Sequence, residues 1–260
     1  MTRYAQRTLL HQPSIANWGK AAPAGIGYGV ATGGTALLTP PTGYAGVSFT
    51  ADGTLTVTTA GLFDVLMFGG GGAGAAGVGG GYSGGAAGAG GKILVTGLNL
   101  DATTYSLVIG AGASDTTNGA TGSPSKFGSL VYALGGGAGG RPSASVQGAN
   151  GGGGGGGSWG ANAGANPLVS GFGFAGGTSA TYGGGGGGAG AAGSGITGGQ
   201  GYDISTFIGG STEYKGVGGT GSTTTGANGE ANSADGGGGG YSADIGGTGG
   251  SGIIYVRFKV

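Results

Sequence analysis

The sequence predicts a mostly β and irregular fold, in which short antiparallel strands frame a bundle of polyglycine-II helices without significant α-helix. The 260-residue chain contains 79 glycines, seven of them in succession at Gly151–Gly157. Stretches with alternating apolar residues flank the glycine-rich region on both sides. Glycine costs about 1 kcal/mol relative to alanine inside a helix and brings no side chain to a sheet. The glycine runs must therefore be ordered, if at all, through their backbone.

The strand pattern begins at 54–58, where Leu55 and Val57 share one face and threonines the other. Residues 62–68 are apolar on both faces apart from Asp64, so this strand is expected to lie centrally in a sheet. Further strands are expected at 92–96, 105–109, 127–134 and 253–260.

The last strand alternates over its whole length. Its inward positions are expected to be Ile254, Val256, Phe258 and Val260. Its outward positions are expected to be Tyr255, Arg257 and Lys259.

Asp64 is the one charged residue in its strand. A buried carboxylate needs a partner, and Arg257 or Lys259 on the closing strand can supply one. The simpler alternative places Asp64 at a strand edge in water.

The glycine runs are predicted to form an ordered lattice. A polyproline-II helix has three residues per turn and no internal hydrogen bonds, so each glycine N–H is free to donate to a neighbouring helix. Alanines such as Ala73, Ala86 and Ala89 are expected at outward-facing positions. The core of the lattice is expected to include Gly151, Gly153, Gly155, Gly183, Gly185, Gly187, Gly237 and Gly239.

The alternative is that the runs are disordered linkers. Glycine (79) and proline (7) make up about a third of the chain, a composition typical of disorder. However, linkers usually contain serine, threonine or charge, whereas these runs are glycine and alanine. An ordered lattice is therefore the favoured prediction.

Residues 1–45 differ from residues 46–260, which we take as one glycine-rich domain. They contain four of the seven prolines and the only histidine, without a sustained strand or helix pattern. An extended anchoring arm that orders against a partner is one interpretation, and a flexible tail is the other. The anchoring residues of such an arm are expected to be Arg3, Tyr4, Arg7, His11 and Trp18.

Composition excludes several classes of function. Charged residues are 7% of the chain, and nine basic and nine acidic residues cancel, so no basic surface is expected to hold nucleic acid. Few charges and no net charge favour association, and we expect a homo-oligomer, for which a trimer is one arrangement. With one histidine and no cysteine, we expect no catalytic activity, no metal site and no cofactor.

Three parts of the chain, in this order, resemble the glycine-rich domain common in bacteriophage tail-fibre and tail-tip proteins. They are residues 49–58, the apolar strand that runs into Gly69–Gly72, and the closing sequence 246–258. The resemblance covers residues 47–260. It implies a rigid sandwich of polyglycine helices whose variable loops, in the tail-tip adhesins, contact receptors on the bacterial surface.

The resemblance implies a virion structural protein, most simply a tail-fibre or receptor-binding component. The alternative is a purely structural head-decoration or fibre protein. The N-terminus lacks the apolar stretch of a secretory signal, and residues 62–68 are far shorter than the ~20 residues of a membrane helix. We therefore expect synthesis in the host cytoplasm, no membrane insertion, and other virion proteins as partners of residues 1–45.

Aromatic residues in the loops are the candidate contacts, because exposed rings stack on sugars and anchor protein interfaces. The expected partner is a glycan or an outer-membrane protein of the host surface. The alternative, favoured for Phe172 and Phe174, is that such rings cap the lattice or pack against another subunit. The candidate contacts are Trp159, Tyr182, Tyr202, Phe207, Tyr214 and Tyr241.

Overall fold

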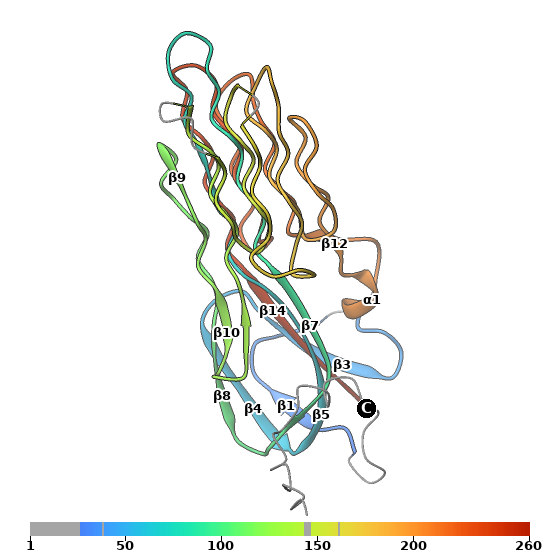
Figure 1. Cartoon of the computed structure of the whole chain (residues 1–260). Coiled ribbons are helices and arrows are strands. Elements are labelled where there is room, and N and C mark those ends of the chain that lie inside the picture. The colour runs from blue at the N-terminus through green and yellow to red at the C-terminus, as the bar shows by residue number, and fades with distance from the viewer. Residues whose placement is uncertain (1–26, 38, 143–146, 161) are drawn as a thin grey trace, which may run out of the picture.

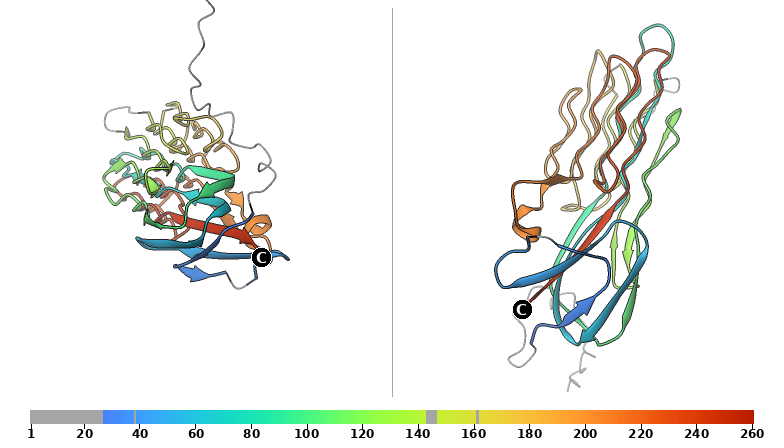
Figure 2. Two further views of the ribbon diagram at one scale, coloured as in Figure 1. Left: turned by 90° about the horizontal axis from the view of Figure 1, so that it is seen from below. Right: turned by 180° about the vertical axis from the view of Figure 1, so that it is seen from behind.

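A computed structural model describes residues 27–37, 39–142, 147–160 and 162–260. The molecule is elongated, with a β-sandwich at one end and long, nearly parallel glycine-rich segments extending from it (Figure 1, Figure 2). The described helix content is a single turn, α1 (Ser205–Ile208). The prediction of a mostly β and irregular fold is therefore confirmed. No helix in the described ranges is long and apolar enough to cross a membrane.

The sandwich consists of two antiparallel sheets, each with five strands in the described chain. The first has the order β2 (Thr35–Ala36), β3 (Tyr44–Phe49), β14 (Ile253–Lys259), β5 (Gly61–Phe68), β7 (Lys92–Leu100). The second has the order β1 (Val30–Thr32), β4 (Gly53–Thr59), β8 (Thr104–Val108), β10 (Ser125–Phe127), β11 (Val131–Ala133). Two short ladders pair β6 (Ala73–Ala75) with β9 (Asn118–Ala120) and β12 (Tyr202–Asp203) with β13 (Tyr214–Lys215).

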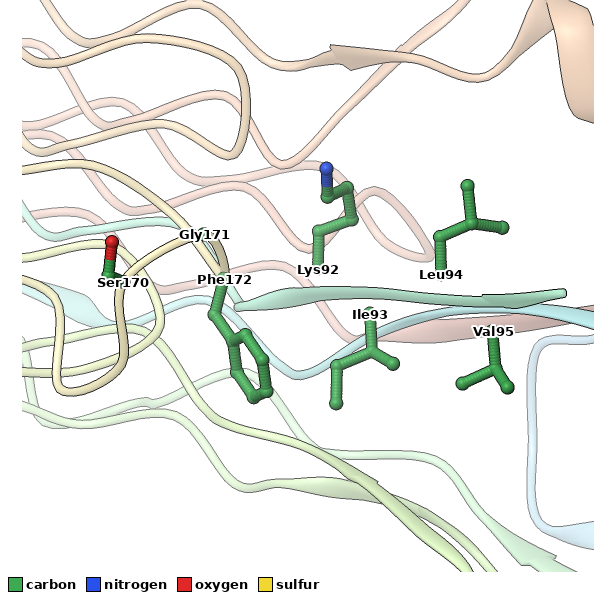
Figure 3. A pocket seen from close by; sticks show the side chains of 7 residues that line it. All are labelled: Lys92, Ile93, Leu94, Val95, Ser170, Gly171 and Phe172. Atoms are coloured by element: carbon green, nitrogen blue, oxygen red, sulfur yellow. The ribbon is translucent and has the colours of Figure 1, made fainter. Parts of the chain in front are cut away.

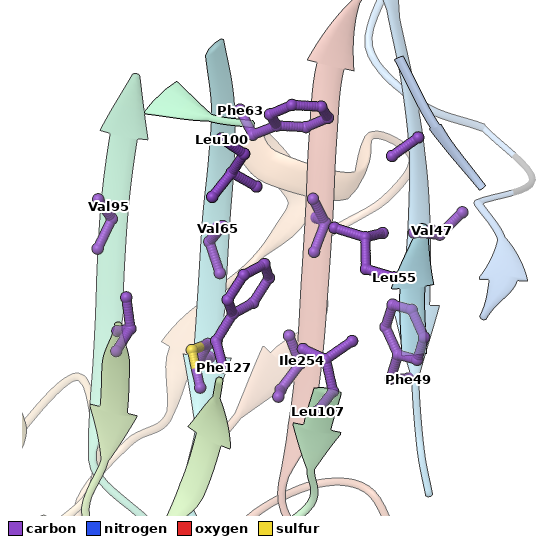
Figure 4. Packing of buried hydrophobic residues seen from close by; sticks show 14 of the residues in the cluster. Val47, Phe49, Leu55, Phe63, Val65, Val95, Leu100, Leu107, Phe127 and Ile254 are labelled. Carbon is purple, nitrogen blue, oxygen red and sulfur yellow. The ribbon is translucent and has the colours of Figure 1, made fainter. Parts of the chain in front are cut away.

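Apolar side chains from both sheets form the main core (Figure 4). Leu55 and Val57 point into this core as predicted, together with Phe127 of the second sheet. A second cluster covers the opposite face of the first sheet and includes Leu66 and Phe68 of β5. Strand β5 is therefore buried on both faces between β14 and β7, which confirms the central position expected from its apolar sequence.

Three predictions for the strands are corrected. The expected strand 127–134 is a hairpin of β10 and β11, because Gly128 has a left-handed φ of 53° and Leu130 N–H donates back to Phe127 O at 3.0 Å. Tyr255 is buried in the second cluster rather than exposed, because the α1 segment covers its side of the sheet. Val260 is 80% exposed, because it lies beyond the end of β14.

The described part of residues 1–45 contributes to the sandwich. Strand β1 pairs with β4, and β2 pairs with β3, which itself begins at Tyr44. The anchoring residues expected between Arg3 and Trp18 lie outside the described residues.

Arg257 is confirmed as the partner of Asp64. Its Nε lies 3.1 Å from Asp64 Oδ2, and both side chains are largely buried. Its Nη1 donates to the backbone carbonyls of Thr206 and Phe207 at 2.9 and 3.0 Å. The guanidinium thus joins the strand pair β5–β14 to the α1 segment, and the alternative of an exposed Asp64 is wrong.

The glycine-rich segments are hydrogen-bonded to one another through their backbones. Segment 83–91 lies at their centre and, among the described residues, bonds to six neighbours. Its N–H groups donate at 2.7–3.0 Å to three of these neighbours. Each of the three accepts from every third residue of the segment. The neighbours that accept are 234–240, 134–140 and 184–187, and those that donate to its carbonyls are 69–75, 153–156 and 219.

The repeat of three residues is that of a polyproline-II helix, here built largely from glycine. Segments 151–157 and 183–190 show the same repeat: Gly153 and Gly156 both donate to segment 86–89, and Gly154 and Gly157 to segment 174–177. This arrangement satisfies buried backbone groups without side chains. The linker alternative is therefore wrong for the described runs.

Glycine is required in this lattice because neighbouring backbones nearly touch. A Cβ built on Gly186 would lie 1.7 Å from the carbonyl oxygen of Ala87, and one on Gly155 would lie 1.8 Å from Ala138 O. The expected core glycines are all buried. Residues at such positions cannot carry a side chain unless a neighbouring segment moves away.

The expectation that the lattice alanines face outward is wrong. Ala73, Ala86, Ala87 and Ala89 are fully buried. Their methyl groups fit opposite glycines: a Cβ on Gly72 would lie 3.1 Å from Ala87 Cβ. Alanine is tolerated inside because the facing segment has no side chain there.

Backbone amides in the lattice are expected to exchange slowly with solvent. Gly153–Gly157 and Gly184–Gly188 donate to neighbouring carbonyls at 2.7–3.1 Å, so exchange requires opening of the lattice. Hydrogen exchange measured by NMR should show protection of these amides relative to Gly79, which lies in an exposed turn. Exchange at free-peptide rates in both runs would contradict the lattice.

Candidate functional site

The loops farthest from the sandwich define the tip of the molecule. The central segment 83–91 leads directly into β7, so residue 83 lies at its far end, about 25 Å away at the rise of a polyproline-II helix. Loops of the glycine-rich segments gather at this end, and the C-terminus lies at the other (Figure 1, Figure 2). We use the name tip loops for the four of them that carry aromatic residues or pack against these, which are 78–82, 158–160, 178–182 and 241–245.

Backbone contacts bring the tip loops together around the end of the central segment. Trp159 N–H donates to Ser83 O at 2.9 Å, and Gly84 N–H donates to Gly240 O at 2.9 Å. A Cβ on Gly183 would lie 1.9 Å from Gly84 O, so the loop 178–182 is held at the same place. The tip is thus fixed by the lattice beneath it.

Four aromatic residues lie on the tip loops in two pairs. The rings of Tyr82 and Trp159 are 4.4 Å apart at an interplanar angle of 66°. Those of Tyr182 and Tyr241 are 5.8 Å apart at 61°. The structure therefore places three of the candidate contact residues at one end and adds Tyr82, which we did not predict.

The other three candidate contacts lie near the sandwich. Phe207 is buried in the second cluster, where its ring lies 4.3 Å from the Arg257 guanidinium. Tyr202 in β12 is half-buried beneath Lys92 Nζ, which lies 4.1 Å from its ring centroid. Tyr214 in β13 is exposed. These residues join the lattice to the sandwich side and do not reach the tip.

Tyr82 was missed because it lies within a glycine run, in the sequence Gly79-Gly-Gly-Tyr-Ser83. From the sequence alone, residues 69–91 look like one continuous glycine-rich stretch. The structure folds them into two antiparallel segments, with a bridge between Val78 and Tyr82 and left-handed φ values at Gly80 and Gly81. The interrupting tyrosine was the available signal for this turn.

A shallow hollow of about 260 Å³ lies beside the first aromatic pair. Asn162 lies at the edge of the hollow, where its Nδ2 donates to Ser158 Oγ at 3.0 Å and to Trp159 O at 2.9 Å. Among the described residues that line the hollow, none is charged. Its lining residues are Tyr82, Pro142, Trp159, Gly160 and Asn162.

A polar cluster lies next to the tip loops, around residues 115–118, where Thr117 O accepts the Ala76 N–H at 3.3 Å and Thr116 O accepts the Gly246 N–H at 3.1 Å. Hydrogen bonds from the Asn118 side chain, and then from the backbone N–H groups of Asn118 and Thr117, lower the pKa of Asp115. Arg141 Nη1 donates to Asn118 Oδ1. In the described part of the chain, no group of three or more His, Asp or Glu side chains is placed to hold a metal ion.

A second hollow lies at the sandwich end, between the start of β7 and residues 170–172 (Figure 3). Phe172, Ile93 and Val95 point to one side of the strand, and Lys92 and Leu94 to the other. Phe172 O accepts the Lys92 N–H at 2.7 Å, and burial lowers the pKa of Lys92. Phe172 is thus part of the junction between lattice and sandwich, consistent with the capping role considered for it.

The sequence model of a family described as a glycine-rich domain matches residues 48–259. The curated proteins compared with the chain contain no match.

Proposed function

The chain belongs to the glycine-rich domain family, and from this premise we propose that it is a non-enzymatic structural protein of a bacteriophage particle, with a tip that binds the host surface. In this proposal the part of residues 1–45 that precedes β1 attaches the chain to other virion proteins, in a homo-oligomer. The first support is that residues 49–58, the strand that runs into Gly69–Gly72, and residues 246–258 resemble the glycine-rich domain of tail-fibre and tail-tip proteins.

The observation that carries the proposal is the grouping of Tyr82, Trp159, Tyr182 and Tyr241 on loops at the end remote from the sandwich. Recognition residues commonly lie on loops held by a rigid scaffold, and tyrosine and tryptophan are enriched among the residues that dominate binding energy. The lattice holds these loops in place before binding, which lowers the entropic cost of association.

Replacement of all four tip aromatics is expected to weaken binding to host cells strongly. Fluorescently labelled full-length protein would be incubated with a panel of bacterial strains and measured by flow cytometry. On any strain bound by the parent protein, a variant with Tyr82→Ala, Trp159→Ala, Tyr182→Ala and Tyr241→Ala should bind at least about tenfold more weakly.

Tyr214→Ala is the matched control, because Tyr214 is 44% exposed but lies near the sandwich. It should leave cell binding unchanged. Equal loss of binding in the control and the tip variant would contradict a role for the tip. Absence of binding to every strain would favour a purely structural role on the capsid or tail.

A further inference from the structure

The hollow beside Tyr82 and Trp159 has the features of a site for an uncharged ring-shaped ligand. Tyr82 and Trp159 are each 39% exposed, so part of each ring is available to a ligand. Their approach at 66° directs the edge of one ring to the face of the other, which fixes both orientations. Apolar C–H groups of a sugar ring pack on such aromatic faces, while its hydroxyl groups require polar partners.

Asn162 supplies a polar partner at the edge of the hollow. Its amide nitrogen is already engaged, donating to Ser158 Oγ and Trp159 O. These two bonds orient the side chain, and in the described structure its Oδ1 accepts no hydrogen bond, which leaves that oxygen for a ligand hydroxyl.

Ser83 follows Tyr82 in the chain and is bonded to Trp159 through its backbone. Its Oγ is fully buried and is the one buried side-chain oxygen without a partner among the described residues. The Ser83 carbonyl is bonded to Trp159 N–H, so the orphaned hydroxyl lies next to the residues that line the hollow. A buried polar group without a partner is costly, but Ser83 is fully buried and does not line the hollow, so its hydroxyl is not counted among the groups that would contact a ligand.

We propose, building on the proposed function, that this hollow binds a neutral pyranose of a bacterial surface glycan. The volume of about 260 Å³ is below the roughly 300–1,000 Å³ of sites for drug-sized ligands, so it accepts a single sugar ring. The described lining residues include no Lys, Arg, Asp or Glu, so they offer an acidic sugar no charged partner. The ligand class is therefore uncharged hexoses and N-acetylhexosamines.

Tryptophan fluorescence can test the site directly. The chain has two tryptophans, so full-length protein with Trp18→Phe reports on Trp159 alone. It would be titrated with the methyl glycosides of glucose, galactose, mannose and N-acetylglucosamine, and of glucuronic acid as the charged comparison. We expect at least one neutral glycoside to change the Trp159 emission with a millimolar Kd, and the glucuronide to bind more weakly.

Tyr82→Ala should weaken this binding at least about tenfold, whereas Tyr241→Ala, which removes a tip aromatic outside the hollow, should change it less than twofold. Saturation-transfer NMR on the Trp18→Phe protein gives a second readout that needs no variant of the hollow. Failure of all four neutral glycosides in both measurements would overturn the sugar site. An equal effect of Tyr82→Ala and Tyr241→Ala would do the same.

The cell-binding assay separates this inference from the function on which it rests. If the protein binds cells through its tip but binds no neutral glycoside, the tip recognises another ligand, such as a surface protein. In that case the proposed function stands and the sugar site is wrong. If neither cells nor glycosides are bound, both proposals fail.

Discussion

Gly186→Ala is expected to lower the free energy of unfolding by about 3 kcal/mol, the upper part of the range for overpacked interiors. The added Cβ would lie 1.7 Å from Ala87 O. That carbonyl accepts the N–H of Gly219 at 2.9 Å, so it cannot move aside without breaking a bond to a third segment. The change would be measured by urea unfolding of the full-length protein.

Gly79→Ala is the control for this prediction. Gly79 lies in the turn 78–82, and a Cβ there would meet no atom within 4 Å and requires no left-handed backbone. This alanine should be neutral or stabilise the protein by up to about 1 kcal/mol, because it restricts the unfolded chain. If Gly186→Ala and Gly79→Ala unfolded at the same urea concentration, the close packing of the lattice would be refuted.

Loss of the Asp64–Arg257 pair is expected to have the second-largest effect. The two side chains are 16% and 15% exposed, so removing one leaves the other largely buried without its partner. Because both side chains keep some exposure, Asp64→Ala should cost about 2 kcal/mol and Arg257→Ala about 3 kcal/mol, the upper part of the range for single substitutions. The arginine change should cost more, because it also removes the donor to Thr206 O and Phe207 O.

A double-mutant cycle isolates the interaction between the two side chains. The double variant should be destabilised by about 1 kcal/mol less than the sum of the single variants. Arg257→Lys should recover only part of the loss, because the lysine ammonium lacks the planar array of separate N–H donors that the guanidinium uses here. Additive effects within error would show that the pair contributes no coupling energy.

Local patterns predicted much of the sandwich. Alternation at 54–58 identified the inward Leu55 and Val57, and the apolar run 62–68 identified a strand with neighbours on both sides. The burial of Tyr255 could not be predicted in this way, because an alternating pattern implies that one face of the strand is exposed to water. It does not show whether another element covers that face. The covering element, around Phe207, is about fifty residues away in sequence, and no local signal links the two.

The lattice was predictable in kind but not in arrangement. Runs with almost no side chains imply bonding through the backbone, but glycine carries no information about which run adjoins which. For the same reason, the sequence did not show that Trp159 and Tyr82 meet while Tyr202 and Tyr214 lie near the sandwich. Loop composition revealed the aromatic candidates. Only the three-dimensional course of the segments shows which of them lie at the tip and which lie near the sandwich.

The direction of the bonds around segment 83–91 has a mechanical consequence. They run across the long axis to six neighbours. A pulling force between the tip and the sandwich acts along the segments, and so loads these bonds in shear. Many bonds must rupture together before one segment can slide past another. The protein should therefore withstand tension along its length far better than its glycine content suggests.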